Sequence, residues 1–265
     1  MESNFCKIAT PISNLFNNKK SADLIQINSD CLECRDSSIK DKYKFQELFH
    51  CELQPIHFFD ENKIKYLKEI KSTKPDLKLI SFHLASCYEN PKIKNGKFFP
   101  NGSKISENQL FSNAEVNFSI IKKIFGENIK IAVENNNHYN TEAYDYITKP
   151  NFIYKIVNDN DINFLYDTSH AKISAYNLHM NLDDYIDILP LNQIIQIHIS
   201  RPGFDKNMNI FDKHYLPTKN ELLEVISLTK RHPKIKYLTV EYYKNCNNLI
   251  KLLNQLRIML KENYG

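Results

Sequence analysis

The feature that most constrains the fold is a series of short apolar segments that end in a histidine or a carboxylate. Six of them follow one another along the chain, and they end at His57, His83, Glu134, Asp167, His198 and Glu241. Amphipathic segments of helical length separate them. Strands that alternate with helices pair in parallel, so their carboxyl ends meet at one edge of a sheet. We therefore expect the six polar side chains at one common face.

Eight strands and eight intervening helices can be assigned in all. We expect strands at 7–11, 23–28, 53–57, 78–83, 129–134, 163–167, 194–198 and 237–241. Helices are expected at 13–22, 37–49, 60–71, 106–125, 150–157, 183–189, 219–230 and 248–261. Eight such units predict a (β/α)8 TIM barrel, a single domain over residues 1–265. The polar stretch 85–104 is expected to be a functional or mobile loop.

Composition excludes several classes of protein. The net charge is +4 and 42% of the residues are hydrophobic, which is ordinary for a globular protein. The lysines form no basic stripe, so a dedicated nucleic-acid binder is not favoured. We see no secretory signal or membrane-spanning run, and expect a cytoplasmic protein with reduced thiols. Cys31 and Cys34 form a C-x-x-C motif without a second pair at zinc-ribbon spacing, and ordinary loop thiols are the favoured interpretation.

Nine residues are candidate metal ligands. Besides the six at strand ends, the set includes three that lie in expected loops of the same face, His170, Asp212 and His214. Carboxylates that converge with imidazoles in a buried site repel one another and are costly to desolvate, and divalent cations supply the missing positive charge. Imidazole and carboxylate ligands suit Zn, Fe(II) and Mn(II). Nine ligands exceed the coordination of one ion, so we predict two or three ions with Glu134 as the bridge.

Several of these motifs resemble a known superfamily. Val133-Glu134-Asn-Asn, Asp167-x-x-His170, Ile197-His198-Ile-Ser, Asp212-Lys-His214 and Val240-Glu241-Tyr-Tyr resemble the xylose-isomerase-like barrels. Within that superfamily, the stretch from Glu134 to Tyr243 is similar to the multinuclear non-heme iron-dependent oxidases, the methanobactin- and thiaglutamate-type peptide-modifying enzymes. The ligand order also resembles endonuclease IV, and His170 is nearer that enzyme because the oxidases often carry Asn there.

The oxidase resemblance implies an activity and its cofactors. It implies two or three iron ions, at least one of them ferrous, with zinc or manganese as other candidates, and O2 as co-substrate. A substrate thiolate, as in a peptide Cys, would bind one iron and lose hydrogen from the carbon next to sulfur. The resemblance also implies a separate partner protein that presents the substrate. The expected catalytic residues are Glu134, Asp167, His198 and Asp212, and the expected substrate-binding residues are Arg201, Asn136 and Tyr242.

Three other functions remain open at this point. The first is a zinc phosphodiesterase that acts on DNA, although Arg201 and Lys213 alone would provide few contacts to DNA phosphates. The second is a sugar isomerase or epimerase with one or two divalent ions. The third is a metal-binding partner protein with a degenerate site, which the intact set of nine ligand types argues against.

Overall fold

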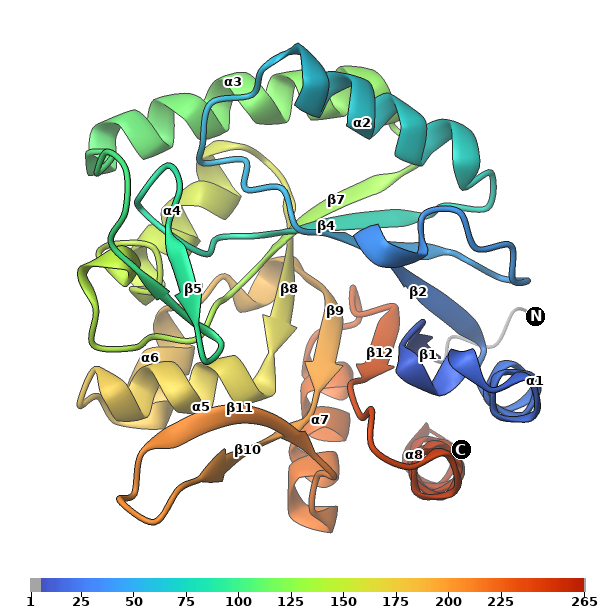
Figure 1. Ribbon diagram of the computed structural model, residues 1–265. Helices are drawn as coiled ribbons and strands as arrows, with labels where there is room; N and C mark the ends of the chain where they lie inside the picture. Colours follow the sequence, from blue (N-terminus) through green and yellow to red (C-terminus); the bar gives the residue numbers. More distant parts are fainter. Residues whose placement is uncertain (1–5, 265) are drawn as a thin grey trace.

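The computed structural model describes residues 6–264, and a closed barrel of eight parallel strands lies at its centre (Figure 1). In barrel order the strands are β1 (Lys7–Pro11), β12 (Tyr237–Val240), β9 (Ile194–Ile199), β8 (Asn163–Asp167), β7 (Lys130–Glu134), β4 (Leu79–His83), β3 (Leu48–Cys51) and β2 (Cys31–Arg35). All neighbouring pairs in this barrel are parallel. The barrel predicted from the sequence is confirmed.

Helices surround the barrel (Figure 1). They are α1 (Lys19–Asn28), α2 (Glu61–Thr73), α3 (Glu107–Phe125), α4 (Pro150–Asp159), α5 (Thr168–Asn177), α6 (Leu182–Ile188), α7 (Lys219–Arg231) and α8 (Cys246–Tyr264). Short 3-10 turns stand at η1 (Asn14–Asn17), η2 (Asp36–Ser38), η3 (Glu142–Tyr144) and η4 (Leu191–Gln193). Among the described residues, none of the helices combines the length and apolar character that crossing a membrane requires.

Two β-hairpins extend the loops at the carboxyl end of the barrel. The hairpin of β5 (Lys92–Lys94) and β6 (Lys97–Phe99) follows β4, within the stretch that was expected to be a plain loop. The hairpin of β10 (Arg201–Phe204) and β11 (Ile210–Tyr215) follows β9. Neither hairpin was predicted, nor was α5.

Local sequence signals set the ends of several helices. Ser106 caps α3 by accepting a hydrogen bond from the Gln109 amide, and Gly126 ends that helix with a φ of 72°. Thr218 and Glu221 form a reciprocal capping box at the start of α7. These signals place α3 and α7 where the sequence predicts them.

An apolar layer closes the barrel interior near its amino end. It takes one residue from each strand, namely Ala9, Cys31, Leu48, Leu79, Ala132, Leu165, Ile195 and Tyr237. Side chains two residues apart share a face of a strand. Two residues beyond this layer, six of the strands accordingly carry polar side chains inward, which are Glu33, His50, Ser81, Glu134, Asp167 and Thr239. The polar layer thus sits directly above the apolar one.

The sequence prediction was wrong for the second and third strands. Residues 23–28, expected as a strand, belong to α1, and the expected helix at 13–22 is divided between η1 and α1. Ala22 and Ile25 are buried at helical spacing while Ile27 is 79% exposed. A short apolar run such as 24–27 does not distinguish strand from helix by its pattern alone.

The error continues to residue 57. The expected helix at 37–49 is mostly a loop that runs from η2 into β3, and the expected strand at 53–57 is a loop. The true second strand, β2, is wholly or partly buried although it carries Glu33 and Arg35. Cys31 and Cys34 therefore lie on a strand rather than in a loop, and both are buried as free thiols.

Candidate metal centre

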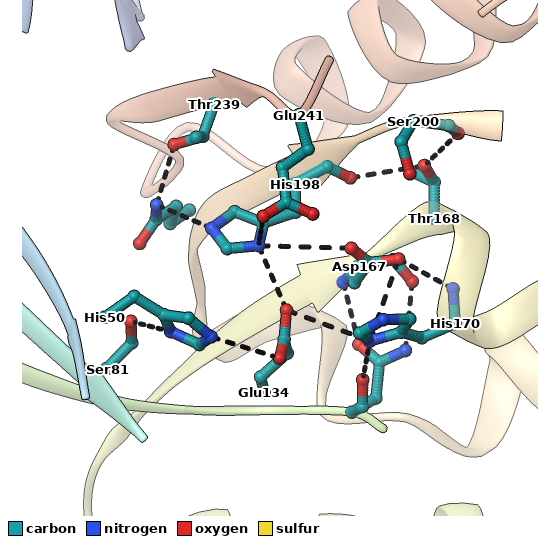
Figure 2. A network of polar contacts seen from close by, with 12 residues as sticks. His50, Ser81, Glu134, Asp167, Thr168, His170, His198, Ser200, Thr239 and Glu241 are labelled. Carbon is teal, nitrogen blue, oxygen red and sulfur yellow. Dashed lines mark hydrogen bonds and ion pairs between the residues drawn. The ribbon is translucent and has the colours of Figure 1, made fainter. Parts of the chain in front are cut away.

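A cluster of imidazoles and carboxylates fills the carboxyl end of the barrel, with Glu134 at its middle (Figure 2). Glu134 Oε2 lies 3.2 Å from His83 Nδ1 and 3.4 Å from His50 Nε2. Glu134 Oε1 lies 3.0 Å from His198 Nδ1 and 3.8 Å from His170 Nδ1. One buried carboxylate thus faces imidazoles on two sides, which is the arrangement a bridging ligand requires.

His198 connects this group to the carboxylates of the neighbouring strands. Its Nδ1 lies 3.5 Å from Glu241 Oε1 and 3.9 Å from Asp167 Oδ2. Its Nε2 lies 2.9 Å from Glu33 Oε2. A fully buried imidazole therefore has carboxylates at both ring nitrogens.

A third group comes from α5 and β11. Asp212 Oδ2 lies 3.4 Å from His170 Nε2 and 3.4 Å from His214 Nε2. His214 Nε2 is also 3.3 Å from Glu241 Oε2, which joins this group to the rest of the cluster. Residues far apart in sequence thus supply three adjacent sets of donor atoms.

Two of the buried histidines have a fixed tautomer. His170 Nδ1 lies 2.9 Å from the carbonyl oxygen of Asn135, and His198 Nε2 lies 2.9 Å from the carboxylate of Glu33. Both partners only accept hydrogen bonds, so these two nitrogens donate. In the neutral rings, His170 Nε2 and His198 Nδ1 then carry the lone pairs, and metal ions bind to such lone pairs.

The donor atoms pass a direct test for metal binding. Besides Glu33 Oε1, which lies against Arg35, five buried atoms of the cluster have no hydrogen-bond partner, namely His50 Nε2, Glu134 Oε2, Asp167 Oδ2, His198 Nδ1 and Asp212 Oδ1. Each buried polar atom without a partner costs about 1–3 kcal/mol. Divalent cations are partners for all five at once, and an imidazole and carboxylate set suits zinc, manganese and ferrous iron. The residues therefore fit a multinuclear metal centre.

The pKa values reflect an excess of negative charge. Burial raises the pKa of the Asp167 carboxyl to about 7, and the nearby carboxylates of Glu134 and Glu241 support that rise. Burial alone would lower the pKa of His198, but the carboxylates of Glu33 and Glu241 outweigh it and hold that pKa well above its ordinary value. Added positive charge would stabilise the ionised carboxylates, as metal ligation requires.

A cavity of about 890 Å³ opens onto the cluster. Its floor is formed by cluster residues and by Arg35 and Tyr243. It is also lined by Ile12 and Asn14, and by Ile93 and Phe98 of the β5–β6 hairpin. Cavities of this size hold small molecules or a few residues of a peptide.

The sequence identifies the family to which this site belongs. Residues 54–261 match the RiPP precursor modification enzyme family MbnB/TglH/ChrH, and this match covers most of the chain. The chain belongs to this family. A RiPP precursor is a peptide that the ribosome makes and that enzymes then modify. A comparison with curated protein sequences finds no match.

Solved structures share the fold of this chain. The 3-keto-D-glucoside 4-epimerase YcjR from E. coli has a TM-score of 0.62 at 13% identity, over 96% of this chain and 99% of that chain. A D-allulose 3-epimerase from Methylomonas sp. has a TM-score of 0.54 at 11% identity, over 98% of each chain. A sugar phosphate isomerase/epimerase from Parabacteroides distasonis has a TM-score of 0.51 at 11% identity, over 100% and 97%. These likenesses agree with the TIM barrel fold of this chain.

One of the expected ligands lies away from the cluster. His57 is in the loop after β3, where its Nε2 is 2.7 Å from the Ser86 carbonyl oxygen, and it belongs to none of the donor groups. His50, on β3 itself, takes the position expected for it and is 1% exposed. The prediction was wrong because it placed the third strand at 53–57, whereas β3 is Leu48–Cys51. A signal for His50 was present in the apolar run of Leu48–Cys51.

The other eight expected ligands do meet in the cluster. These are His83, Glu134, Asp167, His170, His198, Asp212, His214 and Glu241. Sequence reasoning missed Glu33 and Arg35, whose side chains meet at 2.8 Å within the same cluster. No local pattern marks them, because their strand was predicted elsewhere.

The structure changes the expected substrate-binding set. Asn136 is buried and lines the cavity. Arg201 does not line it; its guanidinium lies 5.8 Å from the ring of Tyr215, on the β10–β11 hairpin. Tyr242 packs in the apolar core, while Tyr243 lines the cavity and donates a hydrogen bond of 2.9 Å to Glu241. Alternation along the strand explains this, because Glu241 and Tyr243 share a face.

Proposed function

We propose that this chain is a multinuclear iron-dependent oxidase that uses O2 to modify a thiol-containing peptide. Membership of a family that modifies peptide precursors supports the substrate class. The observation that carries the metal dependence is the set of five unpartnered donor atoms at the carboxyl end of the barrel. The oxidase class rests on the ligand motifs, which resemble those of iron-dependent oxidases.

We propose three adjacent ion sites within the cluster. The first comprises His50, His83 and Glu134; the second comprises Glu134, Asp167, His198 and Glu241; the third comprises His170, Asp212 and His214. Glu134 belongs to two of them and would bridge the ions. Two to three iron ions are proposed, with zinc or manganese as alternatives at individual sites.

The charge of the cluster favours an anionic substrate group. It contains five carboxylates, those of Glu33, Glu134, Asp167, Asp212 and Glu241. Among the described residues of the cluster, the guanidinium of Arg35 is the one permanent positive charge. Two divalent ions would balance the resulting four negative charges. A third would leave two positive charges for exogenous anions to neutralise. A thiolate is such an anion, and sulfur is a favourable ligand for iron.

The exposure of the histidines indicates how a substrate enters. The side chains of His83 and His214 are 23% and 26% exposed, whereas those of His50 and His198 are 1% and 0% exposed. A peptide in the cavity therefore meets His83 and His214 first. Asp212 also borders the cavity, and its unpartnered Oδ1 is the proposed acceptor for the thiol proton of the substrate.

These positions indicate separate roles for the bound iron and for the side chains. Bound iron would supply one-electron and O2 chemistry, which the side chains of the cluster do not provide. The side chains hold the ions, and Glu134, Asp167 and His198 keep the centre buried beneath the cavity floor. Asn136 and Tyr243, on that cavity, would orient the substrate.

The test is to purify the protein without oxygen, measure its iron, and follow O2 uptake with a Cys-containing peptide. We expect two to three irons per chain, O2 consumption and a change in peptide mass. A peptide with Ser in place of Cys should give neither. Colourless protein that carries zinc and nicks DNA at abasic sites would instead indicate a phosphodiesterase, and turnover of sugars without O2 would indicate an isomerase.

A further inference from the structure

The residues Glu33, His198 and Glu241 form a group that has the geometry of a metal site but already contains a cation. Their ligand atoms lie within 4.8 Å of one another, as a bound ion would require. Yet the Arg35 guanidinium reaches into this group. Its Nη2 lies 2.8 Å from Glu33 Oε1 and also contacts Glu241 Oε1. An arginine is always charged in a protein, so this contact supplies a permanent positive charge.

Glu33 makes contacts that fix the imidazole of His198. Its Oε2 accepts hydrogen bonds from Gln196 Nε2 at 2.5 Å and from His198 Nε2 at 2.9 Å. Gln196 Nε2 is held in turn by Thr239 Oγ1 at 2.7 Å. Because His198 Nε2 donates to Glu33, its Nδ1 faces Glu134 and the other proposed ligands.

We propose that Arg35 is a built-in cation that excludes a metal ion from the group of Glu33, His198 and Glu241, and so limits how many ions the centre binds. Glu33 is a positioning residue that turns His198 Nδ1 toward the ions. This inference rests on the metal centre proposed above. Both residues precede the part of the chain that matches the family, residues 54–261, so the match itself assigns them no role.

The two residues act in opposite directions on metal binding. A divalent ion between Glu33 and Glu241 would meet the guanidinium at contact distance, and like charges in a buried site repel strongly. Without Arg35, two carboxylates and an imidazole would face one another with no cation between them. Without Glu33, His198 would lose the acceptor that sets its tautomer.

The experiment is a Co2+ titration of the metal-free protein, followed by visible absorption and by elemental analysis. Arg35→Gln should bind about one more equivalent of Co2+ than the wild type, since the carboxylates of Glu33 and Glu241 lose the cation that lies between them. Glu33→Gln should weaken binding of one ion by about 10–100-fold, as is typical when a partner of a ligating histidine is removed. The double variant should bind no more ions than the wild type.

Two controls separate these effects from damage to the fold. Arg35→Lys keeps the positive charge and should bind the wild-type number of ions. Glu47→Gln changes another buried carboxylate, one that pairs with Lys7 away from the cluster, and should leave Co2+ binding unchanged. If Arg35→Gln does not fold, Arg35→Met removes the charge with a side chain of similar length.

The result that overturns the proposal is an uncharged Arg35 variant that binds the wild-type number of ions with equal or lower affinity. Unchanged Co2+ affinity and absorption in Glu33→Gln would refute the role of Glu33. A wild type that binds no Co2+ at all would instead refute the metal centre. The two failures are therefore distinguishable.

Discussion

The two ends of the barrel both bury charge, but they treat it differently. At the amino end, Glu47 accepts hydrogen bonds from Lys7 Nζ at 2.6 and 2.8 Å and lies 3.5 Å from the Tyr237 hydroxyl. One carboxylate there meets one ammonium, and neither oxygen of Glu47 lacks a partner. At the carboxyl end, carboxylates outnumber the single guanidinium of Arg35, and donor atoms are left over.

This difference shows which feature marks a metal site. Burial of a carboxylate is common to both ends and has no bearing on metal binding by itself. Unbalanced charge together with unpartnered donor atoms occurs in the cluster around Glu134. Four experiments test this comparison.

Glu134→Ala should have the largest effect. It removes the carboxylate that faces His50, His83 and His198, so the bridge between two proposed ion sites is lost. We expect metal affinity to fall by more than about 100-fold, since even the loss of an outer partner costs up to that much. Elemental analysis after dialysis measures it. A variant that keeps the wild-type metal content would show that Glu134 is no ligand.

His50→Ala and His57→Ala form the second test. His50→Ala should weaken the binding of at least one ion by about 10-fold or more. His57→Ala should leave metal content unchanged but lower the free energy of unfolding by about 1–3 kcal/mol, because the buried carbonyl of Ser86 loses its partner. Metal analysis and urea unfolding separate the two. The reverse outcome would restore His57 as the ligand.

Removal of metal should destabilise the wild-type protein. A chelator should lower the free energy of unfolding of the metal-loaded protein by about 3 kcal/mol if ions are present at 100 times their Kd. Glu134→Ala, which loses the ligand shared by two of the three proposed ion sites, should respond less. Thermal unfolding with and without chelator measures this effect. Equal responses of both proteins would locate the bound metal elsewhere.

The amino-end pair should have a small effect that depends on pH. Burial alone would lower the pKa of Lys7, but the Glu47 carboxylate outweighs it and raises that pKa above 10.5. A raised pKa means that the stabilisation is present below pH 10.5 and is lost as the pH rises through the folded-state pKa.

Since the Lys7 side chain is 47% exposed, solvent screens the pair, and Glu47→Gln should cost no more than about 1 kcal/mol. Urea unfolding of the wild type and of Glu47→Gln at neutral and strongly alkaline pH measures the difference between them. That difference should shrink at alkaline pH. A difference that stays constant would mean that Lys7 is not the partner that matters.

The part of the site that could be predicted from the sequence lies on strands that have a clear local sequence pattern. β4, β7, β8, β9 and β12 are apolar runs, and each has a histidine or carboxylate at or next to its end. Parallel pairing then brings those ends together, so His83, Glu134 and Asp167 could be assigned to one face from local pattern alone.

Glu33 and Arg35 could not be predicted because the residues that they contact are far away in the sequence. Glu33 bonds His198 across 165 residues, and Arg35 bonds Glu241 across 206 residues. From the sequence alone, a buried charged residue that has a partner cannot be told apart from an exposed one. The ambiguous apolar run near Ile25 shifted the second strand, and that shift in turn selected His57 in place of His50.

The spacing of Asp167 and His170 links the cluster to the secondary structure around it. Asp167 Oδ1 accepts the amide hydrogen of His170 at 2.6 Å and so caps α5, while its Oδ2 faces the cluster without a partner. An ion held by Oδ2 would also immobilise the cap. The first turn of α5 should then open less often when metal is bound, and slow hydrogen exchange at the His170 amide would act as a gauge of metal occupancy.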